Sequence, residues 1–301
     1  MATDKWNVTD LPDLSGRTAV ITGANSGLGL RTAEGLAGAG AHVVFAVRDV
    51  ERGRAAAATV NGSTEVRRLD LADLSSIREF AAAWEGDLHL LLNNAGVMML
   101  PEQRTRDGFE MQFGTNHLGH FALTNLLLPH ITDRVVTVSS GLHRGGTGRI
   151  DFDDLNGTAN YSPTAAYAQS KLANLLFTLE LQRRLTESGS RVRATAAHPG
   201  YAATNLQSHA ASPVSRLFMK LGNRFMAQDD KAGALPTLYA ATQDLPGASY
   251  VGPDRFQEMR GAPTLVGRSA AASDPEAARR LWTVSEELTG TRFPLGTGVR
   301  S

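Results

Sequence analysis

Cysteine is absent from this chain of 301 residues, and the absence excludes several kinds of chemistry. Without cysteine there is no disulfide, no thiolate metal site and no cysteine nucleophile. Disulfide-rich secreted domains are therefore excluded, and the composition fits a reducing compartment. We expect a cytoplasmic protein.

Neither sign of charge is in excess. Lysine plus arginine and aspartate plus glutamate each number 30, so the formal net charge is zero. A basic excess is the electrostatic signature of proteins that bind nucleic acid or anionic membranes. We therefore expect no nucleic acid partner and no electrostatic attraction to a membrane surface.

Long apolar runs are also missing. The best run, residues 88–100, is interrupted by Asn93 and Asn94, and the first 16 residues contain three aspartates and no apolar centre. A membrane-spanning helix needs about 20 apolar residues, and a signal peptide needs an apolar centre. The sequence therefore predicts a soluble protein with no integral membrane segment. Its 42% of hydrophobic residues is enough for a sizeable core.

Short β-rich apolar segments alternate with helical patterns along most of the chain. Strands are predicted at residues 18–22, 42–47, 65–69, 88–92, 134–138 and 191–196. Helices are predicted at about residues 28–39, 50–60, 107–130 and 275–288. Two more are predicted, one that begins near Asp73 and one that runs through Tyr167 to about residue 187. Such alternation is typical of a parallel sheet covered on both faces. The sequence therefore predicts an α/β fold, a single doubly wound Rossmann-type domain with a mainly parallel sheet.

No linker or internal repeat is visible before about residue 200, so we expect residues 1–301 to form one domain. Within it we expect a core at about 15–255 and a C-terminal helix and tail at about 273–301. Residues 205–228 mix apolar side chains with basic ones. That composition suits an apolar flap over a substrate pocket, an ordinary packed amphipathic helix or an interfacial membrane anchor, and we favour the flap.

Residues 22–29 form a glycine-rich turn that follows the first predicted strand and opens the next helix. Glycines allow main-chain amides to approach a pyrophosphate, and the helix N-terminus adds a positive dipole. Strand, glycines and helix in this order are the context that a dinucleotide site requires, although the spacing here is Gly-x-x-x-Gly-x-Gly. The residues predicted to contact the cofactor are Gly23, Asn25, Ser26, Gly27, Leu28 and Gly29.

The end of the second predicted strand indicates which dinucleotide binds. Val47 stands where NAD enzymes place a carboxylate on the adenosine ribose, and Arg48 follows it. A guanidinium pairs well with a 2′-phosphate, so the sequence predicts NADP(H) rather than NAD(H). Arg48 could instead pair with the neighbouring Asp49 or Glu51. After the third strand, Asp70-Leu71 is placed to contact the adenine, or Asp70 simply caps a turn.

Tyr167 and Lys171 lie four residues apart, and hence on one face of a helix. A tyrosine titrates near about 10, so at neutral pH it exchanges protons poorly unless a neighbour stabilises its phenolate. A lysine one turn away can do so, because an opposite charge favours the ionised form. The same spacing also occurs on solvated helix faces, so its value depends on the rest of the chain.

Together these features resemble the short-chain dehydrogenase/reductase family. The matching segments follow the family's order over about residues 15–205 and are residues 22–29, Asp70, residues 93–96, Asn116, Ser139-Ser140, residues 167–171 and Pro199-Gly200. Arg48-Asp49, residues 139–143, the long insert before Tyr167 and residues 170–174 resemble the retinol dehydrogenase-like branch. The resemblance implies NADP(H) and a small lipophilic alcohol or ketone as substrate, and it also implies a homodimer or homotetramer.

By position, the resemblance assigns a catalytic tetrad to Asn116, Ser140, Tyr167 and Lys171. Tyr167 would be the general acid/base, and Lys171 would lower its pKa and hold the nicotinamide ribose. Ser140 would hydrogen-bond the substrate carbonyl, with Ser139 structural, and Asn116 would anchor a water that leads to solvent. The remaining cofactor contacts would be Asn94, Ala95, Gly96, Pro199, Gly200 and Thr204.

Ser140 and Tyr167 are 27 positions apart (167 − 140), about twice the family's usual gap. The extra residues form either a surface excursion or an added wall of the substrate pocket. A solvated acidic loop, rather than a cation site, is expected of Asp151, Asp153 and Asp154.

No metal is expected, because the histidines form no cluster of ligands. We expect His117, His120 and His198 to pack or hydrogen-bond, whereas His143 could face the pocket.

The sequence therefore predicts an oxidoreductase that interconverts a ketone or aldehyde with an alcohol. Two alternatives stay open. One is an NADP-binding regulatory protein without turnover, and the other is an epimerase or dehydratase on the same scaffold.

Overall fold

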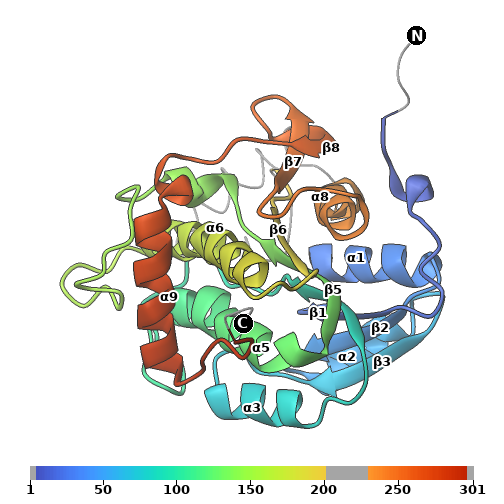
Figure 1. Cartoon of the computed structure of the whole chain (residues 1–301), viewed down its shortest axis with the longest axis horizontal. Helices are drawn as coiled ribbons and strands as arrows, with labels where there is room; N and C mark the ends of the chain where they lie inside the picture. Colours follow the sequence, from blue (N-terminus) through green and yellow to red (C-terminus); the bar gives the residue numbers. More distant parts are fainter. Residues whose placement is uncertain (1–4, 201–229, 297–301) are drawn as a thin grey trace.

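A sheet of eight strands runs through the residues that the computed structural model describes, 5–200 and 230–296 (Figure 1). The spatial order is β3-β2-β1-β4-β5-β6-β7-β8, and every neighbouring pair is parallel except β7 and β8. The strands are β1 Thr18–Thr22, β2 His42–Val47, β3 Thr64–Arg68, β4 Leu88–Asn93, β5 Ile131–Val138, β6 Arg193–Ala197, β7 Tyr250–Arg255 and β8 Arg260–Leu265. The strand order reverses between β1 and β4, which is where doubly wound enzymes bind dinucleotides.

Helices cover both faces of the sheet (Figure 1). One face carries α1 Gly27–Gly38, α2 Val50–Ala57 and α8 Asp230–Thr242; the other carries α3 Leu74–Ala82, α5 Gly119–Leu127 and α6 Pro163–Glu187, with α9 Pro275–Thr289 packed over α5 and α6. Short turns are η1 Val8–Asp10, α4 Met111–Phe113, the π turn η2 Gly114–Leu118, η3 Leu128–His130, η4 Gly141–Arg144 and η6 Ala271–Ser273. In the described ranges, no helix pairs the length with the apolar composition that crossing a membrane requires.

The predicted fold class is confirmed, and all six predicted strands are present. The helix predicted at 107–130 begins only at Met111, because the Glu110 side chain accepts hydrogen bonds from the first amides and ends the preceding loop. Sequence patterns missed α8, β7 and β8. These elements contain Pro236, Pro253 and Pro263, and proline interrupts the patterns by which helices and strands are recognised. Thr204 and the segment 205–228 lie outside the described residues.

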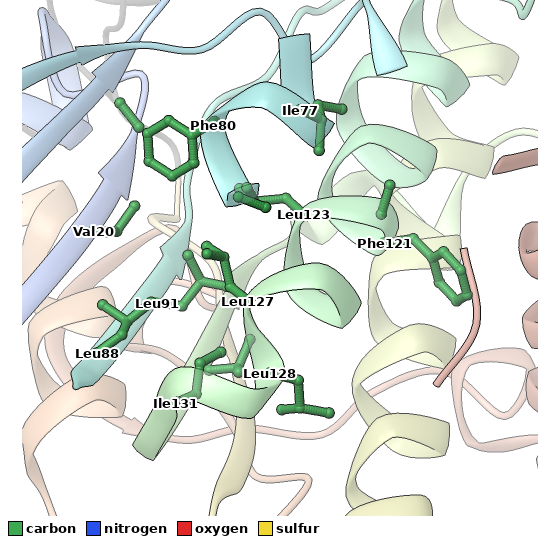
Figure 2. Packing of buried hydrophobic residues seen from close by; sticks show 14 of the residues in the cluster. Val20, Ile77, Phe80, Leu88, Leu91, Phe121, Leu123, Leu127, Leu128 and Ile131 are labelled. Atoms are coloured by element: carbon green, nitrogen blue, oxygen red, sulfur yellow. The ribbon is translucent and has the colours of Figure 1, made fainter. Parts of the chain in front are cut away.

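A buried apolar cluster fixes α3 and α5 against the sheet (Figure 2). Leu88 and Leu91 of β4 pack in it with Phe80 of α3 and with Leu123 and Leu127 of α5. Each fully buried side chain of this size contributes about 1.5–3 kcal/mol of stability. The cluster therefore holds α5, and the π turn that precedes it, rigidly beside the end of β4.

An aromatic cluster joins the last described helix to the centre of the fold. Trp282 of α9 stacks on Phe177 of α6, with ring centroids 5.7 Å apart, and meets Phe121 of α5 edge-on at 4.9 Å. The guanidinium of Arg184 also lies over the Trp282 ring, 4.5 Å from its centroid. Helix α9 thus fixes the spacing of α5 and α6, the two helices that flank the site described next.

Candidate active site

Tyr167 and Lys171 project from the first half of α6 and are almost completely buried. Ser162 caps this helix by accepting a hydrogen bond from Ala165 N, and Pro163 occupies the first turn, where its missing N–H has no cost. Tyr167 is 6% exposed and Lys171 is 4% exposed. The pair therefore does not belong to a solvated helix face, and polar groups buried this deeply need partners.

Lys171 lies against the end of β5. Its Nζ donates to Val138 O (3.1 Å) and lies 5.7 Å from the centroid of the Tyr167 ring. The hydroxyl of Ser139 ties the strand to the helix by donating to the main-chain oxygen of Lys171 (2.8 Å). That bond gives Ser139 the structural role expected of it.

Ser140 begins the turn η4 and lies beside Tyr167. Its Oγ accepts a hydrogen bond from Leu142 N (3.2 Å), and its side chain lies close enough to the phenol of Tyr167 to lower the pKa of that phenol. Two hydroxyls therefore meet at the carboxyl end of β5. Such a pair can bond a single carbonyl oxygen and stabilise negative charge that develops on it.

Burial dominates the electrostatics of the tyrosine and the lysine. It raises the pKa of Tyr167 to about 12, an effect that the hydrogen bond with Ser140 opposes. Burial also lowers the pKa of Lys171 to about 8. Desolvation of the phenolate is thus the larger influence on Tyr167, and the expectation that Lys171 lowers the pKa of Tyr167 stays a prediction.

Asn116 occupies the π turn between α4 and α5. Gly119 N donates to Gly114 O, five residues earlier, and single π turns of this kind are frequent at functional sites. The Asn116 side chain accepts from Val97 N (2.8 Å) and donates to Val97 O (2.9 Å) and Ser170 Oγ (2.9 Å). It therefore joins the loop after β4 to the helix that carries the buried tyrosine and lysine.

The turn between β1 and α1 brings main chain very close to main chain. Gly23 and Gly27 have φ angles of +67° and +52°, in the region that favours glycine. A Cβ on Gly29 would lie 2.5 Å from Gly23 O and 2.6 Å from Asn94 Nδ2. Any side chain at residue 29 would therefore push this turn away from β4.

The N-terminus of α1 differs from those of the neighbouring helices. Asp49, Asp73 and Ser162 cap α2, α3 and α6 with side-chain hydrogen bonds. Ser26 precedes α1 but makes no side-chain cap bond within the described part of the chain. The first amides of α1 and its positive dipole therefore face the glycine turn, an arrangement that suits an anion.

The loop after β4 lies beside this turn. Asn94 N and Ala95 N both donate to Thr22 Oγ1 (2.9 Å each), and Asn94 Nδ2 donates to Thr22 O (2.8 Å). A Cβ on Gly96 would lie 3.2 Å from Asn116 Oδ1. The three predicted residues of this loop thus lie between the glycine turn and the proposed catalytic side chains.

Arg48 is exposed at the end of β2. Asp49 caps α2 by accepting from Arg52 N (3.0 Å), and Glu51 pairs with Arg54 (2.6 Å). The two carboxylates that could neutralise Arg48 are thus engaged elsewhere. In the ranges that the structure describes, no carboxylate forms an ion pair with Arg48.

Asp70 and Leu71 follow β3. Asp70 Oδ1 accepts from Ala72 N (3.0 Å), so this carboxylate holds a turn, which is the alternative that the sequence left open. Leu71 is buried, and a Cβ on Gly119 would lie only 2.5 Å from its main-chain oxygen. The end of β3 therefore packs directly on α5.

The insert between η4 and α6 docks onto the segment before the π turn. The phenol of Tyr161 donates to Leu100 O (2.9 Å) and accepts from Gln112 Nε2 (3.0 Å). Gln112 also donates to Pro163 O (2.9 Å) and accepts from Met99 N (2.7 Å). Tyr161 of the insert and Gln112 therefore fix the insert beside the loop after β4.

The carboxylates of the insert hold its own turns. Asp151 accepts from the amides of Asp153 and Asp154 (3.3 Å each), and Asp154 accepts from those of Thr158 (2.8 Å) and Ala159 (2.9 Å). The described residues contain no group of three or more side chains that could hold a metal ion. These aspartates therefore act as loop caps.

The loop after β6 is anchored on the turn between β7 and β8. His198 Nδ1 accepts from Gly200 N (3.2 Å), and its Nε2 bonds Glu258 Oε2 (3.1 Å). A Cβ on Gly200, which has a φ of +70°, would lie 2.4 Å from Met259 O. Residues 256–258 all have positive φ angles, so strained backbone supports the Pro199-Gly200 loop.

His143 lies under the Ser140 turn. Its Nδ1 donates to Ser140 O (2.7 Å), its Nε2 accepts from Ser269 N (3.2 Å), and its ring meets Tyr250 edge-on. Both nitrogens are engaged within the fold. His143 therefore holds the main chain of Ser140 and does not face the pocket.

Sequence reasoning missed two residues that organise the site, Thr22 and Gln112. Thr22 stood inside the glycine motif with no assigned role, although its position at the end of β1 put its hydroxyl at the switch point. Gln112 lies four residues before Asn116, a spacing that places both side chains on one helix face. That spacing was the available signal for Gln112.

Known proteins match this chain over most of its length. A model of the short chain dehydrogenase family matches residues 17–214. Human retinol dehydrogenase 13 is 44% identical over 298 residues, covering 93% of this chain and 87% of that protein. Human retinol dehydrogenase 12 is 43% identical over 292 residues, covering 93% and 88%.

Solved structures match the fold as well. The crystal structure of an uncharacterized protein from Mycobacterium paratuberculosis is 55% identical, with a TM-score of 0.84, and covers 97% of this chain and 100% of that chain. A protein named as an NAD(P)-dependent gluconate 5-dehydrogenase from Beutenbergia cavernae, solved with NADP at low occupancy, is 28% identical. Its TM-score is 0.57, over 76% of this chain and 91% of that chain.

Proposed function

This chain belongs to the short-chain dehydrogenase family, and from that premise we propose that it is an NADP(H)-dependent oxidoreductase for a lipophilic carbonyl substrate. It would interconvert a ketone or aldehyde with the corresponding alcohol. One observation carries the proposal: the hydroxyl of Ser140 and the buried phenol of Tyr167 lie near each other and beside the buried Lys171, in a site joined by Asn116 to the loop after β4.

The proposed tetrad divides the work between proton transfer and alignment. A bound reduced nicotinamide supplies the hydride. The hydroxyls of Ser140 and Tyr167 hold the substrate oxygen, and Tyr167 gives its proton to the alkoxide that develops there. Lys171 stabilises the phenolate that remains, and its pKa of about 8 suits it to exchange protons near neutral pH.

The pKa of Tyr167 fits it to act as a proton donor. With a pKa of about 12 the phenol stays protonated at neutral pH. A protonated phenol is the form that donates to an alkoxide. We therefore propose Tyr167 as the acid when the carbonyl is reduced and, as the phenolate, as the base when the alcohol is oxidised.

Asn116 is proposed to align the site through its side chain. Both polar atoms of the side chain hold the main chain of Val97, and its Nδ2 also reaches Ser170, next to Lys171 in sequence. The water that the family resemblance assigns to Asn116 stays a prediction. The described hydrogen bonds support a positioning role for Asn116.

The residues present fit a dinucleotide that carries a 2′-phosphate. The absence of a Cβ at Gly29 lets the main chain of the glycine turn pack tightly against the start of α1, and no side chain caps the first turn of α1 in the described part of the chain. Arg48 is exposed and is left without a carboxylate by Asp49 and Glu51 in the described ranges, which supports its pairing with the 2′-phosphate. The proposed contacts are Gly23, Asn25, Ser26, Gly27, Leu28, Gly29, Arg48, Asp70, Leu71, Asn94, Ala95, Gly96, Tyr167, Lys171, Pro199, Gly200 and Thr204.

A lipophilic substrate is supported by two features. The relatives named retinol dehydrogenase act, by that name, on a lipophilic alcohol. The apolar composition of residues 205–228 suits a flap over such a molecule. We propose a retinoid-, steroid- or aryl-ketone-like substrate.

Organisation and location follow as further proposals. The single sheet supports the view that the chain acts as one domain. We propose a cytoplasmic location. For the homodimer or homotetramer that the resemblance implies, a contact across α5 and α6 would have to include α9, because Trp282 covers both helices.

The test is turnover by the purified chain and by Tyr167→Phe. We expect NADPH oxidation with at least one retinoid, steroid or aryl ketone, and a loss of about 10³-fold or more in kcat for Tyr167→Phe with NADPH affinity retained. Full activity in Tyr167→Phe would contradict the proposed acid. NADPH binding with no turnover across the panel would favour a regulatory protein, and product formation without net cofactor consumption would favour an epimerase or dehydratase.

A further inference from the structure

His120 is a buried histidine that has no part in the proposed chemistry. It lies one turn after Asn116, at the start of α5, and is 1% exposed. Its Nδ1 bonds Asn116 O (3.0 Å) and its Nε2 bonds Thr22 Oγ1 (2.9 Å). The imidazole therefore joins a member of the proposed tetrad to the end of β1.

The partners of His120 determine where its proton lies. A main-chain carbonyl only accepts, so Nδ1 must donate to Asn116 O. Nε2 at 2.9 Å is the nearer acceptor for the one hydroxyl proton of Thr22, compared with Leu92 O at 3.4 Å. Donation to Nε2 leaves Thr22 Oγ1 free to accept from Asn94 N and Ala95 N. Every bond in this chain of groups has one donor and one acceptor, so the groups form a connected network.

This network spans two parts of the site that different elements supply. Asn94 and Ala95, on the loop after β4, lie on the proposed nucleotide side. Two residues later, Val97 is held by the side chain of Asn116. The same short loop is thus fixed at its start through Thr22 and His120, and at its end through Asn116 itself.

We infer that His120 is a positioning residue that couples dinucleotide binding to the alignment of Asn116, an inference that rests on the proposed function. The imidazole is a rigid spacer between Thr22 Oγ1 and Asn116 O. A nucleotide that orders the amides of Asn94 and Ala95 therefore also orders the π turn. His120 touches neither the substrate nor the reacting atoms and acts through its two hydrogen-bond partners.

His117 provides a matched control. It lies three residues earlier and is equally buried, but its Nε2 bonds Ser285 Oγ of α9 (2.9 Å) and its ring packs on Phe113. A merely structural histidine in this region should behave as His117 does. The two histidines therefore separate general packing from the proposed coupling.

The experiment compares His120→Leu with His117→Leu in the full chain, using NADPH affinity, kcat and melting temperature. Removing both bonds of His120 leaves buried polar partners unsatisfied, an effect of roughly 5- to 100-fold in an equilibrium constant. We expect His120→Leu to weaken the NADPH Kd by about tenfold and to lower kcat by a similar factor. We expect His117→Leu to lower the melting temperature while Kd and kcat stay within about twofold.

Conservative variants sharpen the comparison and serve if the leucine variant does not fold. His120→Asn keeps a donor near the position of Nδ1, which can still bond Asn116 O. This variant should therefore lose less of kcat than of NADPH affinity. His120→Gln keeps a polar atom near the position of Nε2, so it should retain more of the affinity. Thr22→Val removes the partner of Nε2, and its effect on Kd should not add to that of His120→Leu in the double variant.

Three outcomes would overturn the inference. They are an unchanged Kd in His120→Leu, equal changes in Kd for His120→Leu and His117→Leu, and additive effects with Thr22→Val. NADPH affinity is measured without turnover, so the role of His120 in affinity and the proposed reaction are tested separately. The inference can fail although the chain reduces ketones, and it can hold although the chain reduces none. A wild-type chain that binds no dinucleotide would overturn both the inference and the proposed function.

Discussion

The turn after β1 and the helix α6 reach the same site by opposite means. Around the turn, Gly23 and Gly29 have no side chain and so let neighbouring main chain pack closely, and the groups presented are main-chain amides. Around α6, the groups presented are the side chains of Ser140, Tyr167 and Lys171, held by burial and hydrogen bonds. One half of the site is defined by space and the other by buried polar atoms.

That difference predicts how each half fails. Adding a single carbon should weaken nucleotide binding, because the glycine turn is already packed closely and has no space for a Cβ at Gly29. Removing a single polar atom should damage the catalytic half, because its buried partners then lose a hydrogen bond. Four predictions test the contrast, from the largest expected effect to the smallest.

Ser140→Ala should lower kcat by about 10²- to 10³-fold, because it removes a preorganised hydroxyl from the substrate oxygen. NADPH Kd should stay within about twofold. Steady-state kinetics and nucleotide titration measure the two quantities. The control is Ser139→Ala, which breaks the bond to the main-chain oxygen of Lys171 and should mainly lower stability, by about 1 kcal/mol. A larger kcat loss in the control than in Ser140→Ala would reverse the assignment of the two serines.

Gly29→Ala should weaken NADPH binding by about 10- to 100-fold, because the added Cβ lies 2.5 Å from Gly23 O. At saturating nucleotide, kcat should stay within a few-fold of the wild-type value. Gly38→Ala in the same helix is the matched control, since a Cβ at residue 38 meets no atom within 4 Å. That control should keep its affinity and gain about 0.5–1 kcal/mol of stability. Equal affinities for the two variants would show that the glycine turn is not tightly packed.

Arg48→Asp should reverse the preference between NADPH and NADH by about tenfold or more. The guanidinium attracts the 2′-phosphate, and a carboxylate in its place repels it. Parallel titrations with the two nucleotides measure the ratio of their Kd values. Arg54→Asp alters a neighbouring arginine that already pairs with Glu51, so it should leave the ratio unchanged. Persistence of NADPH preference in Arg48→Asp would mean that another group selects the phosphate.

Acid should destabilise the catalytic half first, because its buried histidines resist protonation. Burial lowers the pKa of His117 to about 3, against an ordinary value of 6.5. Below about pH 6.5 the unfolded chain therefore binds a proton that the folded chain refuses until about pH 3, so stability falls as pH decreases through that window. His117→Leu should flatten the fall by about 1.4 kcal/mol per pH unit, measured by urea unfolding at several pH values. An unchanged slope would indicate that the folded chain accepts the proton.

The sequence was most informative where motifs act through local geometry. Tyr167 and Lys171, the glycine turn and Arg48 were found from spacing and from strand ends, because one helix turn or one β-α connection defines their relations. His120 was expected to pack or hydrogen-bond, but its partner could not be predicted, because Thr22 lies 98 residues away and only the fold brings the two together. The strain at residues 256–258 had no signal in the sequence, since none of these three residues is glycine.

Proline and burial account for the other differences between the sequence-based predictions and the structure. The proline of β7, Pro253, and that of β8, Pro263, lie opposite each other at the edge of the sheet, where a missing donor is tolerated. The raised pKa of Tyr167 could not be anticipated from a neighbouring lysine, because the depth of burial decides the sign. Spacing therefore predicted which side chains would lie together, whereas their electrostatics required the tertiary structure.

The aromatic contact of α9 has a consequence for the order in which this protein is made. Helices α5 and α6 are synthesised well before residue 282, so the surfaces of Phe121 and Phe177 that contact Trp282 stay uncovered until α9 has been made. Apolar surface exposed in this way is prone to association in the cell. The final packing of the two helices that flank the candidate site therefore depends on a helix that follows both of them in the chain.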